Sequence, residues 1–293
     1  MFKYFIYKFG QFCVNQLSLK ACYRIAMFLS DLQCFFSPRD RRAVKNNLKA
    51  VLNLDDDVSV LAKEVFRNFG KYLVEFFRMA RNIDEQFIKQ NVKLNNFDIV
   101  DKILQKGKGA IFLSAHIGNW ELGAVLLSML GYPLVAIALP HKERPVNELF
   151  NKQRESKGVK VVQTNSAVRT SIEALRSNKC IAVLADRDFT ANGEVLNFLG
   201  RETLIPKGAA IFSSKTGAPI IPVFLIRNED NTFTFVAEEP IYPTKESEDE
   251  VDREALLTIM KKYTTVIEKK IREYPTQWLM FRPFWVREKI LAT

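Results

Sequence analysis

Histidine and patterned cysteine are what this 293-residue chain has least of. It contains two histidines, and its four cysteines, Cys13, Cys22, Cys34 and Cys180, show no CxxC spacing. A structural zinc site needs about four such ligands close together, and a disulfide framework needs paired cysteines in a short secreted chain. We therefore expect no bound metal, no cofactor, and reduced thiols that are mostly buried.

Long uncharged apolar runs are also missing. No run of 18 apolar residues without a charge occurs, so neither a clean transmembrane span nor a cleavable signal peptide is supported. Residues 1–36 are apolar but carry Lys3, Lys8, Lys20 and Arg24 among Phe, Ile and Leu. This mixture favours helices that lie in a membrane interface or dip into the bilayer with their lysines reaching back to its surface. Two ordinary helices packed on the domain are the alternative.

Nucleic-acid motifs are absent as well. There is no Cys/His finger, no aromatic ribonucleoprotein motif and no basic heptad array, so we expect no nucleic-acid partner. The balance of 43 Lys+Arg against 33 Asp+Glu gives a net charge of +10, and there are 23 Phe. A basic, Phe-rich chain suits an anionic membrane surface or an acidic protein. A solvated basic surface would explain the charge equally simply.

The hydrophobic pattern of the chain changes near residue 97. Before it, residues 58–81 show helical spacing; after it, apolar runs of strand length alternate with helical stretches. The runs cover residues 110–115, 133–139, 159–162, 180–185 and 219–226, and the helices lie near 119–130, 145–157, 165–177 and 206–216. Continuous apolar strands in β-α-β order predict an α/β fold with a mixed, largely parallel central sheet flanked by helices.

The last third of the chain completes this division. Residues 232–240 alternate in polarity and predict a strand antiparallel to the one before it, followed by a charged helix over residues 250–273. No internal repeat and no low-complexity linker occur. We therefore expect an N-terminal membrane-associating helical arm, residues 1–36, and an α/β domain, residues 37–293.

His116 stands where the first strong apolar run ends, in "AIFLSAHIGNWELG". Ligands of open α/β sheets bind beyond the carboxyl ends of strands. If His116 lies in the turn and Glu121 in the first turn of the next helix, the two side chains can meet, and Glu121 would orient the imidazole as a general base. A structural histidine remains an alternative, and a metal site is a weaker one. No GxSxG, P-loop or complete GxGxxG motif accompanies the pair.

Five ordered stretches carry a family resemblance. "HIGNWELG" resembles the HX4(D/E) motif of glycerolipid acyltransferases, and "RRAVKNNL", "RPVNELFNKQRESKGVKVV", "ADRDF" with "FLGRETLIPKGAA", and "YPTQWLMF" are similar to further blocks of one family. That family is the bacterial lipid A biosynthesis acyltransferases, the late lauroyl/myristoyl transferases. Phosphatidylinositol mannoside acyltransferases show similar motifs, so the resemblance leaves the acceptor lipid open.

The resemblance implies a membrane-associated O-acyltransferase at the cytoplasmic face of the cell inner membrane. Acyl carrier protein would donate the acyl chain, a lipid A precursor hydroxyl would accept it, and His116 with Glu121 would be catalytic. Arg154 is the candidate active-site cation, with an exposed helix arginine as the alternative. Acylation of another lipid, a lysophospholipid or a phosphatidylinositol mannoside, and a non-catalytic membrane-binding protein are the other functions considered.

Three more residues are candidates for binding substrate. Asp186 and Arg187 directly follow an apolar run and could contact acceptor phosphate or sugar, or form a solvated loop. Lys207 follows Pro206 at a helix start, where the family often has a small hydroxyl residue; it could hold phosphate or be exposed. The tail "FRPFW" also departs from the family pattern. His141 is interpreted as a loop residue.

Overall fold

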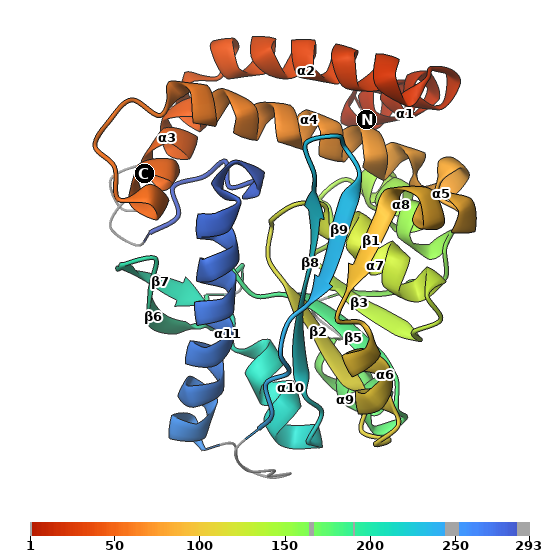
Figure 1. Ribbon diagram of the computed structural model, residues 1–293, viewed down its shortest axis with the longest axis vertical. Coiled ribbons are helices and arrows are strands. Elements are labelled where there is room, and N and C mark those ends of the chain that lie inside the picture. Colours follow the sequence, from red (N-terminus) through yellow and green to blue (C-terminus); the bar gives the residue numbers. More distant parts are fainter. Residues whose placement is uncertain (1, 164–166, 190, 244–251, 286–293) are drawn as a thin grey trace.

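The fold is that of a computed structural model, which describes residues 2–163, 167–189, 191–243 and 252–285 (Figure 1). Its centre is a seven-stranded sheet in the order β1-β9-β8-β2-β5-β3-β4. The strands are β1 (Val92–Asn95), β2 (Ala110–Ser114), β3 (Leu134–Ala138), β4 (Lys160–Gln163), β5 (Cys180–Leu184), β8 (Ile220–Arg227) and β9 (Phe233–Ala237). Neighbouring strands are parallel except for the antiparallel pair β8 and β9, which confirms the predicted mixed, largely parallel sheet.

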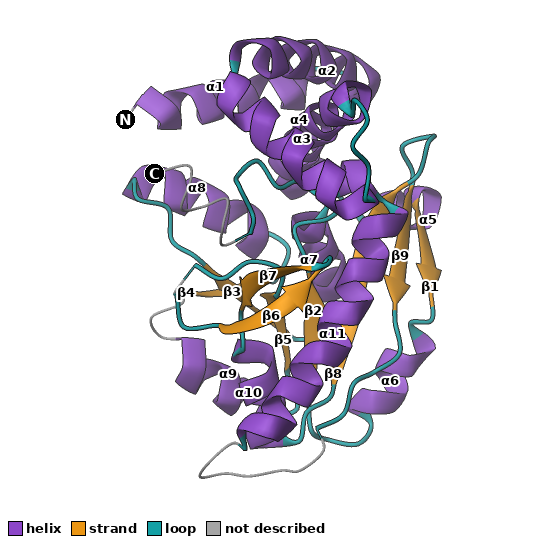
Figure 2. Cartoon of the chain, turned by 90° about the vertical axis from the view of Figure 1, so that its left-hand side faces the viewer, coloured by secondary structure: helices purple, strands orange, loops and turns teal. Residues whose placement is uncertain are grey.

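Helices cover both faces of this sheet, as its continuous apolar strands predict. On one face pack α6 (Asp98–Leu104), α7 (Trp120–Met129) and α8 (Arg144–Glu155). On the other pack α9 (Ala167–Arg176), α10 (Gly208–Thr216) and α11 (Arg253–Glu273), and Figure 2 shows α9, α10 and α11 gathered on that side. Successive residues of β2 alternate between the two cores: Ile111 faces the α9–α11 side and Phe112 the α6–α8 side.

Four N-terminal helices form a layer across one end of the sheet (Figure 1). They are α1 (Phe2–Gln16), α2 (Leu19–Phe36), α3 (Pro38–Leu52) and α4 (Ser59–Asn82). The long helix α4 joins this layer to the sheet, since its Phe76, Phe77 and Met79 are in the same core as α7 and α8. Helix α2 lies close to α4 because Gly70 has no side chain; a Cβ there would collide with Ser30.

The outer surface of α1 and α2 remains uncovered. It exposes eleven large apolar side chains, Phe5, Ile6, Phe9, Phe12, Leu17, Ile25, Phe28, Leu29, Leu32, Phe35 and Phe36. The cationic Lys3, Lys8, Lys20 and Arg24 are exposed on the same two helices. Within the described residues, no helix combines the length and apolar character needed to cross a bilayer.

Several elements were not predicted from the sequence. They are α5 (Glu85–Asn91), β1, α6, a short helix η1 (Pro275–Gln277), and a two-stranded antiparallel sheet of β6 (Glu194–Phe198) and β7 (Arg201–Ile205). Leu199 and Gly200 form the β6–β7 turn with positive φ angles of 55° and 83°, a geometry that Gly200 adopts without strain.

Candidate active site

The register of two neighbouring strands brings His116 and Asp186 together. β2 and β5 are parallel and pair Ser114 with Leu184, and each strand is followed two residues later by one of the two polar side chains. The imidazole Nδ1 of His116 lies 2.8 Å from Asp186 Oδ1, and the His116 backbone N–H donates to Asp186 Oδ2 at 3.1 Å. The carboxylate therefore fixes both the main chain and the ring of His116.

Asp186 is completely buried, yet it is held as an anion. Burial by itself would raise its pKa, but the attraction of His116 and hydrogen bonds from His116 and Trp278 outweigh that effect, so the pKa of Asp186 is lowered. Trp278 Nε1 donates to Asp186 Oδ2 at 3.0 Å. An ionised carboxylate beside Nδ1 places the proton of a neutral imidazole on Nδ1. The other nitrogen, Nε2, is then free to accept a proton.

Glu121 does not occupy the place predicted for it. Its carboxylate forms a two-pronged ion pair with Arg154 of α8, with 2.6 Å to Nη2 and 2.7 Å to Nε, while the His116 ring bonds Asp186. The predicted orientation of His116 by Glu121 is thus corrected. The physical reason is the helix start: Asn119 caps α7 through Leu122 N–H, and Glu121, two residues into the helix, turns toward α8.

A segment near the C-terminus closes around the histidine loop. Gln277 accepts from Gly118 N–H through its carbonyl, and Leu279 N–H donates to the carbonyl of His116. Gly118 has φ +61°, and a Cβ there would overlap the carbonyl oxygen of Leu225. The loop that presents His116 is therefore held between β8 and the "PTQWL" segment. Trp278 and Gln277 belong to a block recognised by resemblance, but no feature of the sequence indicates what either side chain contacts.

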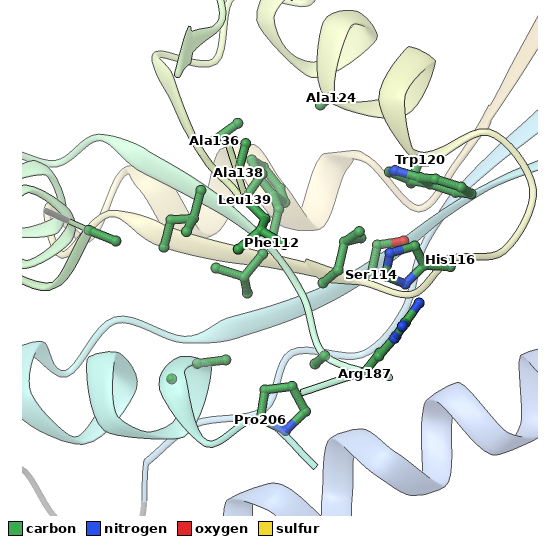
Figure 3. Close-up of a pocket in the computed structure, with 18 of the residues that line it drawn as sticks. Phe112, Ser114, His116, Trp120, Ala124, Ala136, Ala138, Leu139, Arg187 and Pro206 are labelled. Carbon is green, nitrogen blue, oxygen red and sulfur yellow. The ribbon is translucent and has the colours of Figure 1, made fainter. Parts of the chain in front are cut away.

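A cavity of about 570 Å³ opens beside His116. Figure 3 shows an apolar side, with Phe112, Ala136, Ala138 and Leu139, and a second side with His116, Trp120 and Arg187. The predicted site residues His116, Glu121, Arg154, Arg187 and Lys207 all line it, and Asp186 lies directly behind His116. His141, interpreted as a loop residue, is in a loop and also lines the cavity.

Arg187 and Lys207, the two predicted cations that do not pair with Glu121, have different neighbours. The guanidinium of Arg187 lies over Phe189, 4.5 Å from the ring centroid, and the Phe189 ring is 6.1 Å from that of His116. Burial lowers the pKa of Arg187, and Asp186 next to it acts in the opposite direction. Lys207 Nζ lies 3.4 Å from the carboxylate of Glu194 in β6, so Lys207 forms an ion pair with that strand. Figure 3 shows Arg187 on the same side of the cavity as the imidazole of His116.

Metal ligands do not gather at this cavity. Over the residues whose placement is described, no group of three or more His, Cys, Asp or Glu side chains is arranged to hold a metal ion. The chemistry available from the chain itself is a general base with a buried carboxylate, next to a cation and an apolar chamber.

Comparison with known proteins identifies relatives along most of the chain. A family model described as bacterial lipid A biosynthesis acyltransferase matches residues 1–287. The phosphatidylinositol mannoside acyltransferase of Mycolicibacterium smegmatis is 26% identical over 234 residues, 78% of this chain and 73% of that protein. The same enzyme of Mycobacterium tuberculosis CDC 1551 is 25% identical, over 75% and 69%. The 1-acyl-sn-glycerophosphate acyltransferase PlsC of Thermotoga maritima aligns with a TM-score of 0.39 at 16% identity, over 87% of this chain and 99% of that chain.

Proposed function

Since this chain belongs to the bacterial lipid A biosynthesis acyltransferase family, we propose that it moves a fatty acyl chain from acyl carrier protein to a hydroxyl of a lipid A precursor. The observation that carries the mechanism is the His116–Asp186 pair, 2.8 Å apart, at the wall of a largely apolar cavity. No covalent enzyme intermediate and no cofactor are needed, because the reaction requires only an acyl transfer and the passage of one proton from the hydroxyl, through the imidazole, to the departing thiolate.

His116 Nε2 takes the proton of the acceptor hydroxyl as its oxygen attacks the thioester carbonyl carbon. Asp186 keeps the ring in the correct tautomer and stabilises the imidazolium that forms. The tetrahedral intermediate then collapses, the carbon–sulfur bond breaks, and the imidazolium returns its proton to the departing thiolate. The products are an ester and the free thiol of the carrier, so the histidine ends in its starting state.

The developing oxyanion needs donors close to His116. Arg187 and the first amides of α7, those of Trp120 and Glu121, are the groups we assign to it, since the first amides of a helix have no acceptor within it. Such donors typically contribute about 3–4 kcal/mol to transition-state stabilisation. Lys207, at the start of α10, is assigned to an acceptor phosphate.

The apolar side of the cavity is the place for the acyl chain. Its alanine, leucine and phenylalanine side chains have no polar groups that a hydrocarbon would leave unsatisfied. Glu121 and Arg154 neutralise one another on the wall, at 12% and 10% side-chain exposure, so neither presents an uncompensated charge to the chain. We therefore assign Arg154 to the cavity wall and not to the oxyanion.

A second acceptor class has its own support. The curated relatives cited above are named phosphatidylinositol mannoside acyltransferases. A mannosylated inositol lipid and a lipid A precursor both present a sugar hydroxyl on an anionic lipid, so the same base and the same cations serve either one. The acceptor therefore has to be chosen by experiment.

The test is an acyl-transfer assay with purified full-length protein, a lauroyl, myristoyl or palmitoyl chain on acyl carrier protein or coenzyme A, and either a lipid A precursor or a phosphatidylinositol mannoside, read by mass spectrometry. We expect ester formation that His116→Ala abolishes. Product from the mannoside alone would replace the lipid A assignment. Near-normal turnover of His116→Ala would contradict the base mechanism for both acceptors.

The arm of residues 1–36 is assigned to an anionic membrane surface at the cytoplasmic face of the inner membrane, where acyl thioesters are made. Its exposed Phe side chains would enter the headgroup boundary while Lys3, Lys8, Lys20 and Arg24 meet anionic lipid, at about 1 kcal/mol per well-placed cation. The net charge of +10 also suits an acidic carrier protein.

This membrane assignment is tested by flotation with phosphatidylglycerol vesicles at low and high salt. Phe5→Ser, Phe9→Ser and Phe12→Ser together should reduce recovery with the vesicles. Val168→Ser with Val195→Ser, which removes exposed apolar side chains outside the arm, is the matched control and should not. Equal recovery of both variants would refute the assignment.

A further inference from the structure

Glu75 is a buried carboxylate that the proposed mechanism does not use. It lies on α4 and is 3% exposed, and it does not line the cavity. Three donors from three different elements converge on it: Tyr23 Oη of α2 at 2.5 Å, Asn119 Nδ2 at 2.6 Å and Arg227 Nη2 of β8 at 2.7 Å. Its two carboxylate oxygens thus connect the N-terminal helical layer to the sheet.

The first connection from Glu75 runs to the start of α7. The side-chain amide N–H of Asn119 donates to Glu75, its side-chain oxygen accepts from Leu122 N–H, and its backbone N–H donates to the carbonyl of Leu225. Every one of these bonds fixes the residue that stands three positions after His116. The direction in which the histidine loop enters α7 is therefore set partly by Glu75.

The second connection runs to the partner of the imidazole. Arg227 pairs with Glu75 through its guanidinium, and its backbone N–H and carbonyl bond both ends of the Gln277 amide at 3.0 and 2.8 Å. The next residue, Trp278, donates to Asp186. Glu75 thus reaches both members of the His116–Asp186 pair, by separate routes that do not pass through the cavity.

Stability alone is a poor reason for this arrangement. Burying a carboxylate and a guanidinium costs several kcal/mol per ion before their attraction compensates, and apolar residues of similar size often stabilise a core as well or better. What a charged network supplies and an apolar one does not is direction, because each hydrogen bond fixes the angle of its partner.

From this we infer that Glu75 is a positioning residue for acyl transfer, which holds the His116 loop through Asn119 and the Asp186 side through Arg227, and which Tyr23 ties to the membrane-facing helix α2. The inference rests on the proposed function of His116 as the base. It extends the catalytic architecture to the outer helical layer, so that the helices assigned to the membrane and the site of the chemistry share one buried carboxylate.

The test replaces the network by apolar residues in the full-length protein. Tyr23→Phe, Glu75→Leu and Arg227→Met are combined so that no charge is left buried alone. We expect a Tm close to that of the wild type, kcat lower by about 100-fold, and an unchanged KM for palmitoyl acyl carrier protein. The acid limb of the pH–rate profile should also change, a readout that a merely structural role would not move.

A control uses an ion pair between α2 and α4, the two helices that the Tyr23–Glu75 hydrogen bond also joins. Arg67 of α4 binds Asp31 of α2 through two hydrogen bonds of 2.8 and 2.9 Å, and neither residue forms a hydrogen bond or ion pair with the histidine loop among the described residues. Asp31→Leu with Arg67→Met should change the Tm while leaving kcat within about 2-fold of the wild type. Wild-type kcat in the combined network variant, or an equal loss in this control, would overturn the inference.

A second variant decides the matter if the combined one does not fold. Asn119→Ser keeps an oxygen that can cap α7 but removes the amide that reaches Glu75. We expect a nearly unchanged Tm with kcat reduced by about 10-fold; an unchanged kcat would refute the role of Glu75. Turnover by His116→Ala would instead refute the assignment of His116 as the base. Failure of the proposed function is therefore distinguishable from failure of the role inferred for Glu75.

Discussion

Two carboxylates flank His116, and they are used in different ways. Glu121 lies five residues along the chain on the same helix start, but it pairs with Arg154 on the cavity wall. Asp186 lies seventy residues away and holds the imidazole at 2.8 Å. Nearness in sequence is therefore a poor guide to which group orients a base: the register of two strands brought the distant residue closer than one helical turn brought the near one.

The largest difference between the roles of Asp186 and Glu121 should appear in kcat when the charge of each carboxylate is removed separately. Asp186→Asn retains the shape but loses the anion and the preferred tautomer, and we expect kcat to fall by roughly 1,000-fold or more, by analogy with the aspartate of serine protease triads. Steady-state acyl transfer with either acceptor measures it. A loss below about 10-fold would mean that Asp186 does not orient the base.

Glu121→Gln should act first on stability. It leaves the Arg154 guanidinium buried without its counter-ion, a change that typically costs about 3–5 kcal/mol. We expect a clear fall in Tm and a smaller loss of kcat than in Asp186→Asn. The control is Glu121→Leu with Arg154→Met, which should recover most of the Tm because no charge remains unpaired. A kcat as low as that of Asp186→Asn in a well-folded Glu121→Gln protein would restore the predicted Glu121 role.

The stability of the protein in acid should depend on the charge of Asp186. The depressed pKa of Asp186 contributes stability that is present above its ordinary value, about 3.9, and is lost as the pH falls through the depressed value. Trp278→Phe removes one donor and brings the pKa back toward ordinary. The free energy of unfolding of Trp278→Phe should therefore be lower than that of the wild type, and part of this loss should be present at neutral pH and disappear in acid.

Trp285→Phe is the control for that titration. Trp285 is also buried, but its Nε1 donates to the carbonyl of Phe198 and not to a carboxylate. Chemical denaturation at several pH values measures the free energy of unfolding. The loss of this free energy in Trp285→Phe should be the same at each pH. A deficit of Trp278→Phe that is equally independent of pH would remove Trp278 from the support of Asp186.

The smallest effect should come from the outer support of Arg154. Asn151 accepts from Arg154 Nη1 at 3.1 Å, in a position comparable to that of Trp278 beside Asp186. Asn151→Ala should lower stability by about 1 kcal/mol, with little change in kcat, because the two bonds to Glu121 remain. A loss of kcat larger than that of Trp278→Phe would show that the Arg154 side of the cavity takes part in the chemistry.

Much of the fold was predictable because its signals are local. The apolar runs that became β2, β3, β4, β5 and β8 and the helices between them lie close to the predicted ranges. The signal is clearest for β2 and β8, since a strand buried on both faces must be apolar almost throughout. The order of strands was not predictable in this way. β2 lies beside β5, although β3 and β4 lie between them in the chain, and that adjacency is what pairs His116 with Asp186.

The network around Glu75 was still harder to find. Glu75 stands in an amphipathic helix where a glutamate is ordinarily exposed, and Tyr23, Asn119 and Arg227 are scattered over more than two hundred positions. No spacing rule links them, because they meet through the packing of α2 and α4 across the end of the sheet. The β6–β7 pair was not predicted for a different reason: its strands are short, and Gly200 is the main local sign of its turn.

Nuclear magnetic resonance on protein labelled with ¹⁵N in histidine can determine whether Asp186 or Glu121 holds the Nδ1 proton of His116, since the chain has only two histidines to assign. We expect Asp186 to hold it. One imidazole should then have an unprotonated Nε2 and a protonated Nδ1 whose hydrogen resonates downfield, a proton signal that persists in Glu121→Gln and is lost in Asp186→Asn. A signal that survives Asp186→Asn and disappears in Glu121→Gln would contradict it.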